Sequence, residues 1–200
     1  NWTIVMRENF EGAFPGSNWL VGDNDGAANG EYYWAKSNCL SHEGDYAGWA
    51  VGGGADGSQL YCGAEYPDNA QSYMIYGPFS LVGANRAEFS LRVWLNAEER
   101  YDYLRVMASL DGLNFSYDPD VHTGTWGEWR EITLDLGNVP GLGNLKGQPR
   151  VWVGLLFETD TSVSMTDGAL VDELVVRKCS SCASAPSAQS AGRVGTFRLR

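Results

Sequence analysis

Two adjacent carboxylates, Asp172 and Glu173, interrupt an apolar stretch near the end of the chain, DGALVDELVVRK (residues 167–178). The valines and leucines around them are typical of a buried strand. An ionised carboxylate in such a strand is costly unless something pairs with it. A salt bridge from Arg7 or Lys178 to Asp172 is one possible answer.

A second set of residues combines aromatic rings with charged groups. On three expected strands, alternation points these side chains away from the core: Arg92, Trp94, Tyr103, Arg105, Trp152 and Glu158. If the three strands are neighbours, one sheet face presents aromatic platforms, on which sugar rings stack while charged groups bind hydroxyls. The alternative is that loops, or the 38–66 excursion, cover this face and the aromatics form a second small core. Trp126, near a turn, is a further candidate for a site at the loop end.

Signs of catalysis are weak. The two histidines, His42 and His122, stand in no metalloprotease spacing, and no G-x-S-x-G elbow occurs. Glu98 and Glu158 are conceivable as a glycosidase pair, but nothing singles them out. We therefore predict a non-catalytic domain.

Four cysteines fall into two pairs. Cys39 and Cys62 flank a glycine-rich excursion and are predicted to form a disulfide, whereas Cys179 and Cys182 form a lone C-x-x-C. A zinc site built from all four is disfavoured because the first pair lacks knuckle spacing. Disulfides, and with them an exported, extracellular protein, are the preferred interpretation.

Composition limits the class of protein. The chain has 200 residues, of which 25 are Gly, 8 Trp and 10 Tyr, and helical periodicity is lacking, which indicates one all-β domain. The net charge of −11 argues against nucleic acid and anionic membranes as partners, and is compatible with a divalent cation or a neutral ligand. No stretch approaches the ~18 apolar residues of a membrane span.

The expected strands alternate clearly from residue 71 onward. The segments SYMIYGPFSL, AEFSLRVWLNA, YDYLRVMASLDG, WREITLDL, RVWVGLLFETD and ALVDELVVRK are predicted strands. The first of these is expected to end at Gly77-Pro78, and no helix is expected. We assign residues 1–182 to the domain and 183–200 to a linker with a basic tail. The final RVGTFRLR is a truncated next domain, the start of an anchoring signal, or a strand that pairs elsewhere.

Several phrases in order carry a family resemblance. They are ENFEGAFPGSNW, GDYAGWA, SYMIYGPFSL, YDYLRVMASLDG, WREITLDL and ALVDELVVRK, and they span roughly residues 6–178. In this order they resemble bacterial MAM-like jelly-roll domains of the cleaved-adhesin, or choice-of-anchor J, type. The opening F-E and closing V-D-E-L are also similar to jelly-roll carbohydrate-binding modules stapled by calcium. The resemblance implies an antiparallel β-sandwich of two packed sheets.

The resemblance also implies a structural Ca²⁺ where the first and last strands meet. By position, its ligands are Glu11 and Asp172, with an oxygen from Asp45. Ca²⁺ takes roughly 6–8 hard oxygens, and a cation there would explain an acid in an apolar strand. The function expected is that of a calcium-stabilised accessory module in a larger exported bacterial protein, binding polysaccharide or a surface glycan. The alternative is a protein-binding, adhesion or structural module beside a secreted peptidase.

Overall fold

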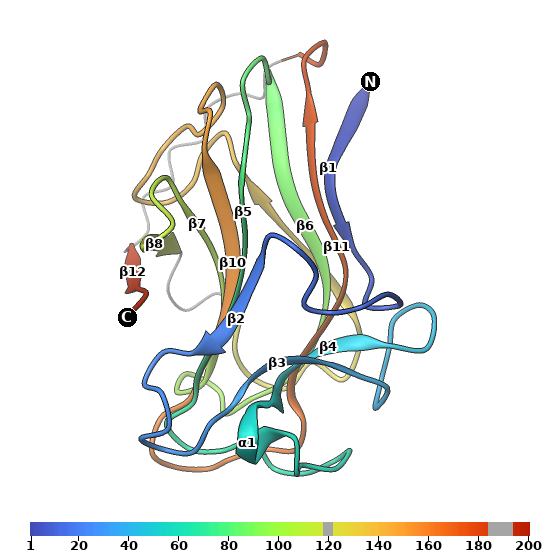
Figure 1. Ribbon diagram of the computed structural model, residues 1–200, viewed down its shortest axis with the longest axis vertical. Helices are drawn as coiled ribbons and strands as arrows, with labels where there is room; N and C mark the ends of the chain where they lie inside the picture. The colour runs from blue at the N-terminus through green and yellow to red at the C-terminus, as the bar shows by residue number, and fades with distance from the viewer. Residues whose placement is uncertain (118–121, 184–193) are drawn as a thin grey trace.

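The computed structural model describes residues 1–117, 122–183 and 194–200. Within these residues two six-stranded antiparallel sheets pack face to face (Figure 1). The predicted all-β jelly-roll sandwich is confirmed. The one departure is a single turn of helix, α1 (Gly54–Gly57), in a segment where no helix was expected. No helix in the described part of the chain is long and apolar enough to cross a membrane.

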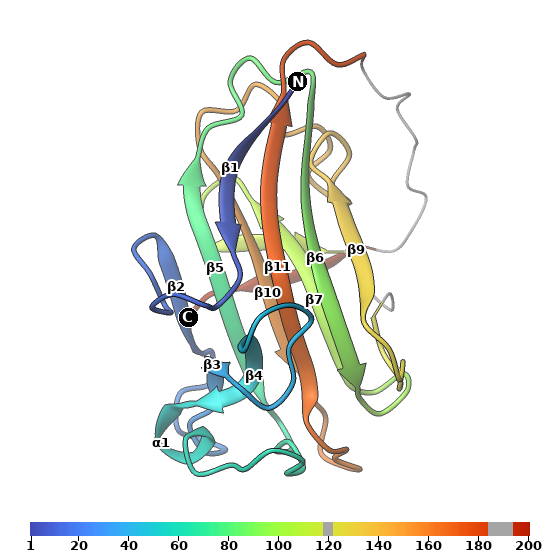
Figure 2. The same ribbon diagram turned by 90° about the vertical axis from the view of Figure 1, so that its right-hand side faces the viewer.

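Sheet 1 brings the two ends of the domain together. Its order is β3-β4-β11-β6-β9, and β1 also pairs with β11 (Figure 2). The strands are β1 (Trp2–Glu8), β3 (Tyr33–Ser37), β4 (Ala47–Gly53), β6 (Arg86–Asn96), β9 (Arg130–Asp135) and β11 (Gly168–Cys179). The last long strand thus lies centrally, between β6 on one side and β1 and β4 on the other.

Sheet 2 has the order β12-β8-β7-β10-β5-β2. The strands are β2 (Trp19–Asp23), β5 (Gln71–Phe79), β7 (Tyr103–Ser109), β8 (Asn114–Tyr117), β10 (Val151–Glu158) and β12 (Gly195–Arg198). Strand β5 runs through Gly77-Pro78, so the predicted end there is wrong. Phe79 still pairs with Val151 of β10, and a shift of register before Val153 accommodates the proline, which has no N–H to donate.

The alternation read from the sequence places the main core between the sheets. Phe89, Leu91, Val93 and Leu95 of β6 are all buried there. The expected disulfide Cys39–Cys62 is formed, and Cys179 and Cys182 form a second one. The first joins the β3–β4 loop to the segment between α1 and β5, and the second closes a short loop at the end of β11.

The C-terminal segment forms a strand rather than only a tail. Residues 195–198 make β12, which pairs with β8 and lies outside β7 and β10 in Figure 1. Three interpretations of RVGTFRLR were left open, and the structure agrees with the third, a strand that pairs with another part of the chain, here β8. The predicted linker residues 184–193 lie outside the described residues.

Candidate functional site

The carboxylate of Asp172 is fully buried and is held by main-chain N–H groups. The pairing of β11 with β6 shifts between Asp172 and Val175, and Glu173 takes a left-handed φ of 50° in this bulge. The Oδ2 atom accepts hydrogen bonds from the N–H groups of His42 (2.9 Å) and Glu43 (3.1 Å), and Oδ1 accepts one from Glu173 (2.7 Å). Three such donors satisfy the hydrogen-bond acceptors of this buried side chain. They answer the question of what pairs with Asp172.

Neither Arg7 nor Lys178 forms an ion pair with Asp172 in the described part of the chain, so the structure does not have the salt bridge that the sequence left open as an alternative. The bulge places Glu173 beside Arg7 instead, with Oε2 and Nη1 3.9 Å apart. Lys178 lies at the other end of β11 and donates to the carbonyl oxygen of Ser80 (2.9 Å).

Glu11 holds the same β3–β4 loop from another side. Its Oε1 atom accepts hydrogen bonds from the N–H groups of Asp45 and Tyr46, both at 2.9 Å. Gly44 permits this approach, because its φ is +67° and a Cβ there would lie 2.4 Å from that oxygen. The β3–β4 loop is therefore bound by an acid from each end of the domain.

The three predicted calcium ligands border one loop, but the acids that the structure groups most closely are others. Glu98, Asp102 and Asp160 each offer an oxygen, and these oxygens all lie within 4.8 Å of one another. They come from the β6–β7 loop and from the turn that follows β10. The role of Glu11, Asp45 and Asp172 as ligands stays a prediction.

Asp102 is the fully buried member of this acidic group. Its Oδ2 accepts a hydrogen bond from the Tyr66 hydroxyl (2.5 Å), and its Oδ1 accepts one from the Asp160 N–H (2.8 Å). Burial raises the pKa of Asp102, although both hydrogen bonds act against that rise. Desolvation, with the charges of Asp160 and Asp102, also raises the pKa of Glu98. Like charges held this close favour a proton or a cation between them.

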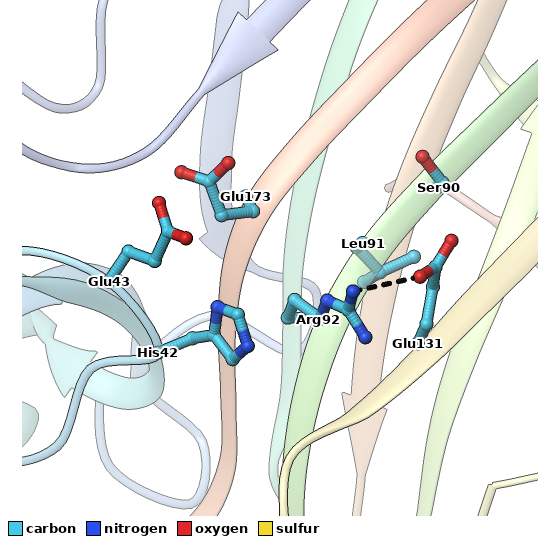
Figure 3. A pocket seen from close by; sticks show the side chains of 7 residues that line it. All are labelled: His42, Glu43, Ser90, Leu91, Arg92, Glu131 and Glu173. Carbon is cyan, nitrogen blue, oxygen red and sulfur yellow. Dashed lines mark ion pairs between the residues drawn. The ribbon is translucent and has the colours of Figure 1, made fainter.

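A small polar pocket lies on the outer side of sheet 1, beside the β3–β4 loop (Figure 3). Its volume is about 180 Å³, and its lining is His42, Glu43, Ser90, Leu91, Arg92, Glu131 and Glu173. Figure 3 shows the Arg92–Glu131 ion pair (2.9 Å) on one side, with Glu43 and Glu173 together on the other. Most of the lining residues are charged, and the ring of His42 meets that of Trp129 edge-on at 5.8 Å.

The predicted aromatic and charged face is divided between the two sheets. Strand β6, with Arg92 and Trp94, belongs to sheet 1, whereas β7 and β10 are neighbours in sheet 2. The expectation of a single shared face is therefore wrong for β6, because the alternation of a strand does not choose its neighbours. Trp94 is half-buried and packs against the main core.

On the outer side of sheet 2, Arg105 is the centre of a charged and aromatic group. It is 6% exposed, and its Nε lies 2.7 Å from Oε1 of Glu158. Its guanidinium lies 3.7 Å from the ring centroid of Tyr103 and 5.0 Å from that of Tyr117. Among the described residues, its Nη1 has no hydrogen-bond partner. The predicted trio of Tyr103, Arg105 and Glu158 does come together.

The rest of this outer face forms a second small core, the alternative left open by the sequence. Its buried members are Ile75, Met107, Phe115, Leu156 and Phe197. The cover comes from β8 and β12, not from the 38–66 excursion.

Trp152 lies at the margin of this second core and lines a pocket of about 220 Å³. The other lining residues are Asn18, Trp19, Leu20, Ile75, Gly77 and Gly112. A Cβ on Gly77 or Gly112 would come within 2.7 or 2.9 Å of the Trp152 indole, so the two glycines let this ring lie close to the main chain. Trp152 and Trp19 thus border one pocket, but the Trp19 ring packs against Tyr76 and the main core.

Trp126 lies at the loop end, as expected, but it is half-buried and packs against the main core. Its indole N–H donates to the carbonyl oxygen of Thr123 (3.1 Å), and its ring meets His122 edge-on at 5.9 Å. Burial lowers the pKa of His122 to about 4, so the imidazole is neutral at pH 7.

Sequence reasoning missed Trp19 and the acidic group. A tryptophan after a Pro-Gly turn carries no strand alternation that would assign it a face. Glu98, Asp102 and Asp160 are 62 residues apart at their extremes and share no motif spacing.

Solved structures of other proteins share the fold of this chain. No protein-family model matches the chain, and no curated protein sequence matches it. The K1 cleaved adhesin domain of Lys-gingipain from Porphyromonas gingivalis W83 is similar in structure. Its TM-score is 0.53 at 18% identity, over 86% of this chain and 96% of that one. The K3 cleaved adhesin domain of the same protein has a TM-score of 0.54 at 16% identity, over 87% and 98%.

A xylan-binding domain of Paenibacillus barcinonensis Xyn10C, of the CBM22 type, has a TM-score of 0.49 at 14% identity, over 92% and 97%. The suspected resemblance is confirmed at the level of fold. This chain has a jelly roll like that of the cleaved adhesin domains.

Proposed function

We propose that this chain is a non-catalytic accessory module that binds a polysaccharide or a surface glycan at the Trp19–Trp152 pocket. The observation that carries the proposal is Trp152, which lines a pocket on the outer side of sheet 2; Trp19 borders the same pocket, with its ring packed against the main core. The C–H groups of a sugar ring pack against the face of an aromatic side chain. Asn18 also lines the pocket, and its amide can hydrogen-bond sugar hydroxyls.

The size of the pocket fits a chain ligand better than an enclosed small molecule. At about 220 Å³ it is smaller than the ~300–1,000 Å³ of ordinary ligand pockets. A polysaccharide would place one ring there and continue over the surface.

Two further parts of the proposal concern the setting of the module. Two disulfides support an exported protein, because such bonds persist in oxidising compartments. Calcium is proposed as a structural ion, with the Glu98–Asp102–Asp160 group and the predicted Glu11–Asp45–Asp172 set as its two candidate positions. Carboxylate oxygens are the ligands that Ca²⁺ prefers, and both sets offer them.

Adhesion to a protein is the second candidate function. One observation favours it: the outer side of sheet 2 already holds a peptide strand, β12, against β8. Sheets that accept a strand of their own chain can also accept one from a partner.

Pull-down on insoluble polysaccharides, together with a glycan array, tests the glycan proposal. Trp152→Ala should abolish retention. Trp94→Ala is the matched control, because it removes the same side chain from the opposite sheet and should leave retention unchanged. Thermal unfolding of both variants verifies that they are folded. The proposal fails if no glycan retains the wild type, or if the two variants lose retention equally.

A further inference from the structure

The last seven residues of the chain cross the outer side of sheet 2. Strand β12 pairs antiparallel with β8 from Gly195 opposite Tyr117 to Arg198 opposite Asn114. The crossing continues past the strand, because the Leu199 N–H donates to the Leu113 carbonyl (2.9 Å). The Arg200 N–H then donates to Oδ1 of Asn24, 3.0 Å away and just beyond β2. The segment therefore reaches from one edge of the sheet to the other.

One side chain fixes the segment to the face. Phe197 is 8% exposed and belongs to the second core with Ile75, Met107 and Leu156. Its ring centroid lies 6.2 Å from those of both Tyr73 and Phe115. The two residues beside it in β12, Thr196 and Arg198, are exposed.

Gly195 is required by close contact rather than by backbone conformation. A Cβ at this position would lie 2.2 Å from Cε2 and 2.7 Å from Cζ of Tyr117. Tyr117 is itself held by the guanidinium of Arg105, whose centre is 5.0 Å from its ring. The site therefore accepts glycine at position 195 and an aromatic side chain at position 197.

The surface that holds residues 194–200 consists of β8 and the second core, and it is separate from the main core. Strand β8 pairs with β7 at only two positions, and β12 pairs with β8 alone. The side chains that Phe197 covers belong to the second core, not to the core between the sheets. The segment also carries Arg198 and Arg200, while the whole chain has a net charge of −11. Charge and shape both favour docking of a basic strand.

We propose that the outer side of sheet 2, bordered by β8, is a binding site for an extended peptide of the pattern Gly-x-aromatic-x-apolar with basic residues. Residues 194–200 of the same molecule are its resident ligand. The site binds by strand addition: main-chain hydrogen bonds to β8 give affinity, and the Phe197 and Gly195 positions give specificity. It does not depend on the glycan proposal, because its ligand is a peptide that pairs with β8. The two sites share Ile75 and the margin of the second core, but the glycan pocket does not include β8.

A fluorescent peptide with the sequence of residues 194–200, VGTFRLR, tests the site in the full chain. Gly195→Val in the protein should displace the resident segment through the clash with Tyr117. Fluorescence anisotropy should then show binding of the peptide to this variant, and binding to the wild type weaker by about tenfold or more, because a tethered ligand occupies the site at high effective concentration. Far-ultraviolet circular dichroism and thermal unfolding verify that the variant keeps its fold.

Matched peptides make the test specific. A peptide with the Gly195→Val change should not bind the variant protein, whereas one with Thr196→Ala, at an exposed position, should bind like the parent. All three peptides carry the same two arginines, so attraction to an acidic protein affects them equally. Equal binding of all three peptides, equal binding to both proteins, or no binding at all overturns the proposal. A wild-type dimer in light scattering that Gly195→Val converts to a monomer shows exchange of the segment between copies, and overturns its docking within one molecule.

Discussion

The Oδ2 atom of Asp172 lies 2.9 Å from the main-chain nitrogen of His42, 130 residues earlier in the sequence. This bond joins the central strand of sheet 1 to the β3–β4 loop, which Glu11 binds from the other side. The buried carboxylate of Asp172 thus anchors the β3–β4 loop to strand β11. The arrangement makes the loop position depend on one buried carboxylate.

Asp172→Asn is expected to lower the free energy of unfolding by about 2–4 kcal/mol. Both carboxylate oxygens accept main-chain N–H groups, and asparagine replaces one oxygen with an NH₂ group, which cannot accept. At least one buried N–H group is then left without an acceptor. Urea denaturation at pH 7, followed by tryptophan fluorescence, measures the change. Glu173→Gln is the control: its contact with Arg7 is long (3.9 Å), so a loss within about 0.5 kcal/mol is expected. Equal losses in the two variants would contradict the account of the buried acid.

If the proposed site binds calcium, the ion should raise the melting temperature of chelator-treated protein by roughly 5–10 °C at ~100-fold excess over its dissociation constant, because a ligand of the folded state alone stabilises that state. Differential scanning fluorimetry with and without Ca²⁺ measures the shift. Magnesium at the same concentration should be less effective, since it requires a smaller octahedral site.

Two variants locate the ion. Loss of the shift in Asp160→Asn, with the shift kept in Asp172→Asn, assigns it to the group around Asp102. The reverse result assigns it to the predicted set with Glu11. A wild-type melting temperature that is the same in chelator and in calcium refutes both positions.

Arg105 and Glu158 should couple strongly in a double-mutant cycle. Arg105→Ala leaves a half-buried carboxylate unpaired and is expected to cost about 2–3 kcal/mol, with a coupling energy of about 1–2 kcal/mol to Glu158→Ala. The exposed pair Arg130–Glu128 is the control, and its coupling should be below about 0.5 kcal/mol. Arg105→Lys should not restore the wild-type value, since an ammonium cannot stack between Tyr103 and Tyr117. Full rescue by lysine would show that charge alone matters.

Asp23 should make the fold more stable as the pH falls. Burial, and then its contact with Asp25, raises the pKa of Asp23 to about 6 from 3.8. The folded state therefore binds a proton on Asp23 more tightly than the unfolded state does. The resulting contribution to the free energy of unfolding is fully present below pH ~4 and is lost as the pH rises through about 6. Asp23→Asn should stabilise the protein at pH 7–8, and less so at pH 4, in thermal unfolding across this range.

Asp111 provides a contrast of opposite sign for that experiment. Hydrogen bonds from Asn114 and Leu113 lower the pKa of Asp111. Its contribution to stability is present above the unfolded pKa and is lost only as the pH falls below that value, so Asp111→Asn should destabilise the protein at pH 7. If both variants shift stability in the same direction at pH 7, the assignment of the two carboxyl groups is incorrect.

The sequence predicted single strands better than it predicted their neighbours. Alternation correctly placed Phe89, Leu91 and Val93 of β6 in the core. It could not show that Trp94 and Trp152 lie on different sheets, because a period of two assigns each side chain to a face and says nothing about which strand pairs with which.

The sequence also predicted only some of the residues of the candidate site. Tyr103, Arg105 and Glu158 were expected on one face, and β7 and β10 are neighbours in register there. Trp19 and Phe197 were not expected near that face, since both arrive from distant parts of the chain, through β2 and β12. Contacts of this separation depend on how the whole chain closes, and no local pattern encodes them.

By itself, the sequence determined the class of fold, the inward residues of the long strands and the Cys39–Cys62 disulfide, because these depend on composition, on a period of two and on pairs within one excursion. Only the tertiary structure decided that backbone N–H groups compensate the buried Asp172, and that the last strand covers one outer face. The physical reason is that hydrogen-bond satisfaction and coverage of a face are properties of groups brought together from opposite ends of the chain.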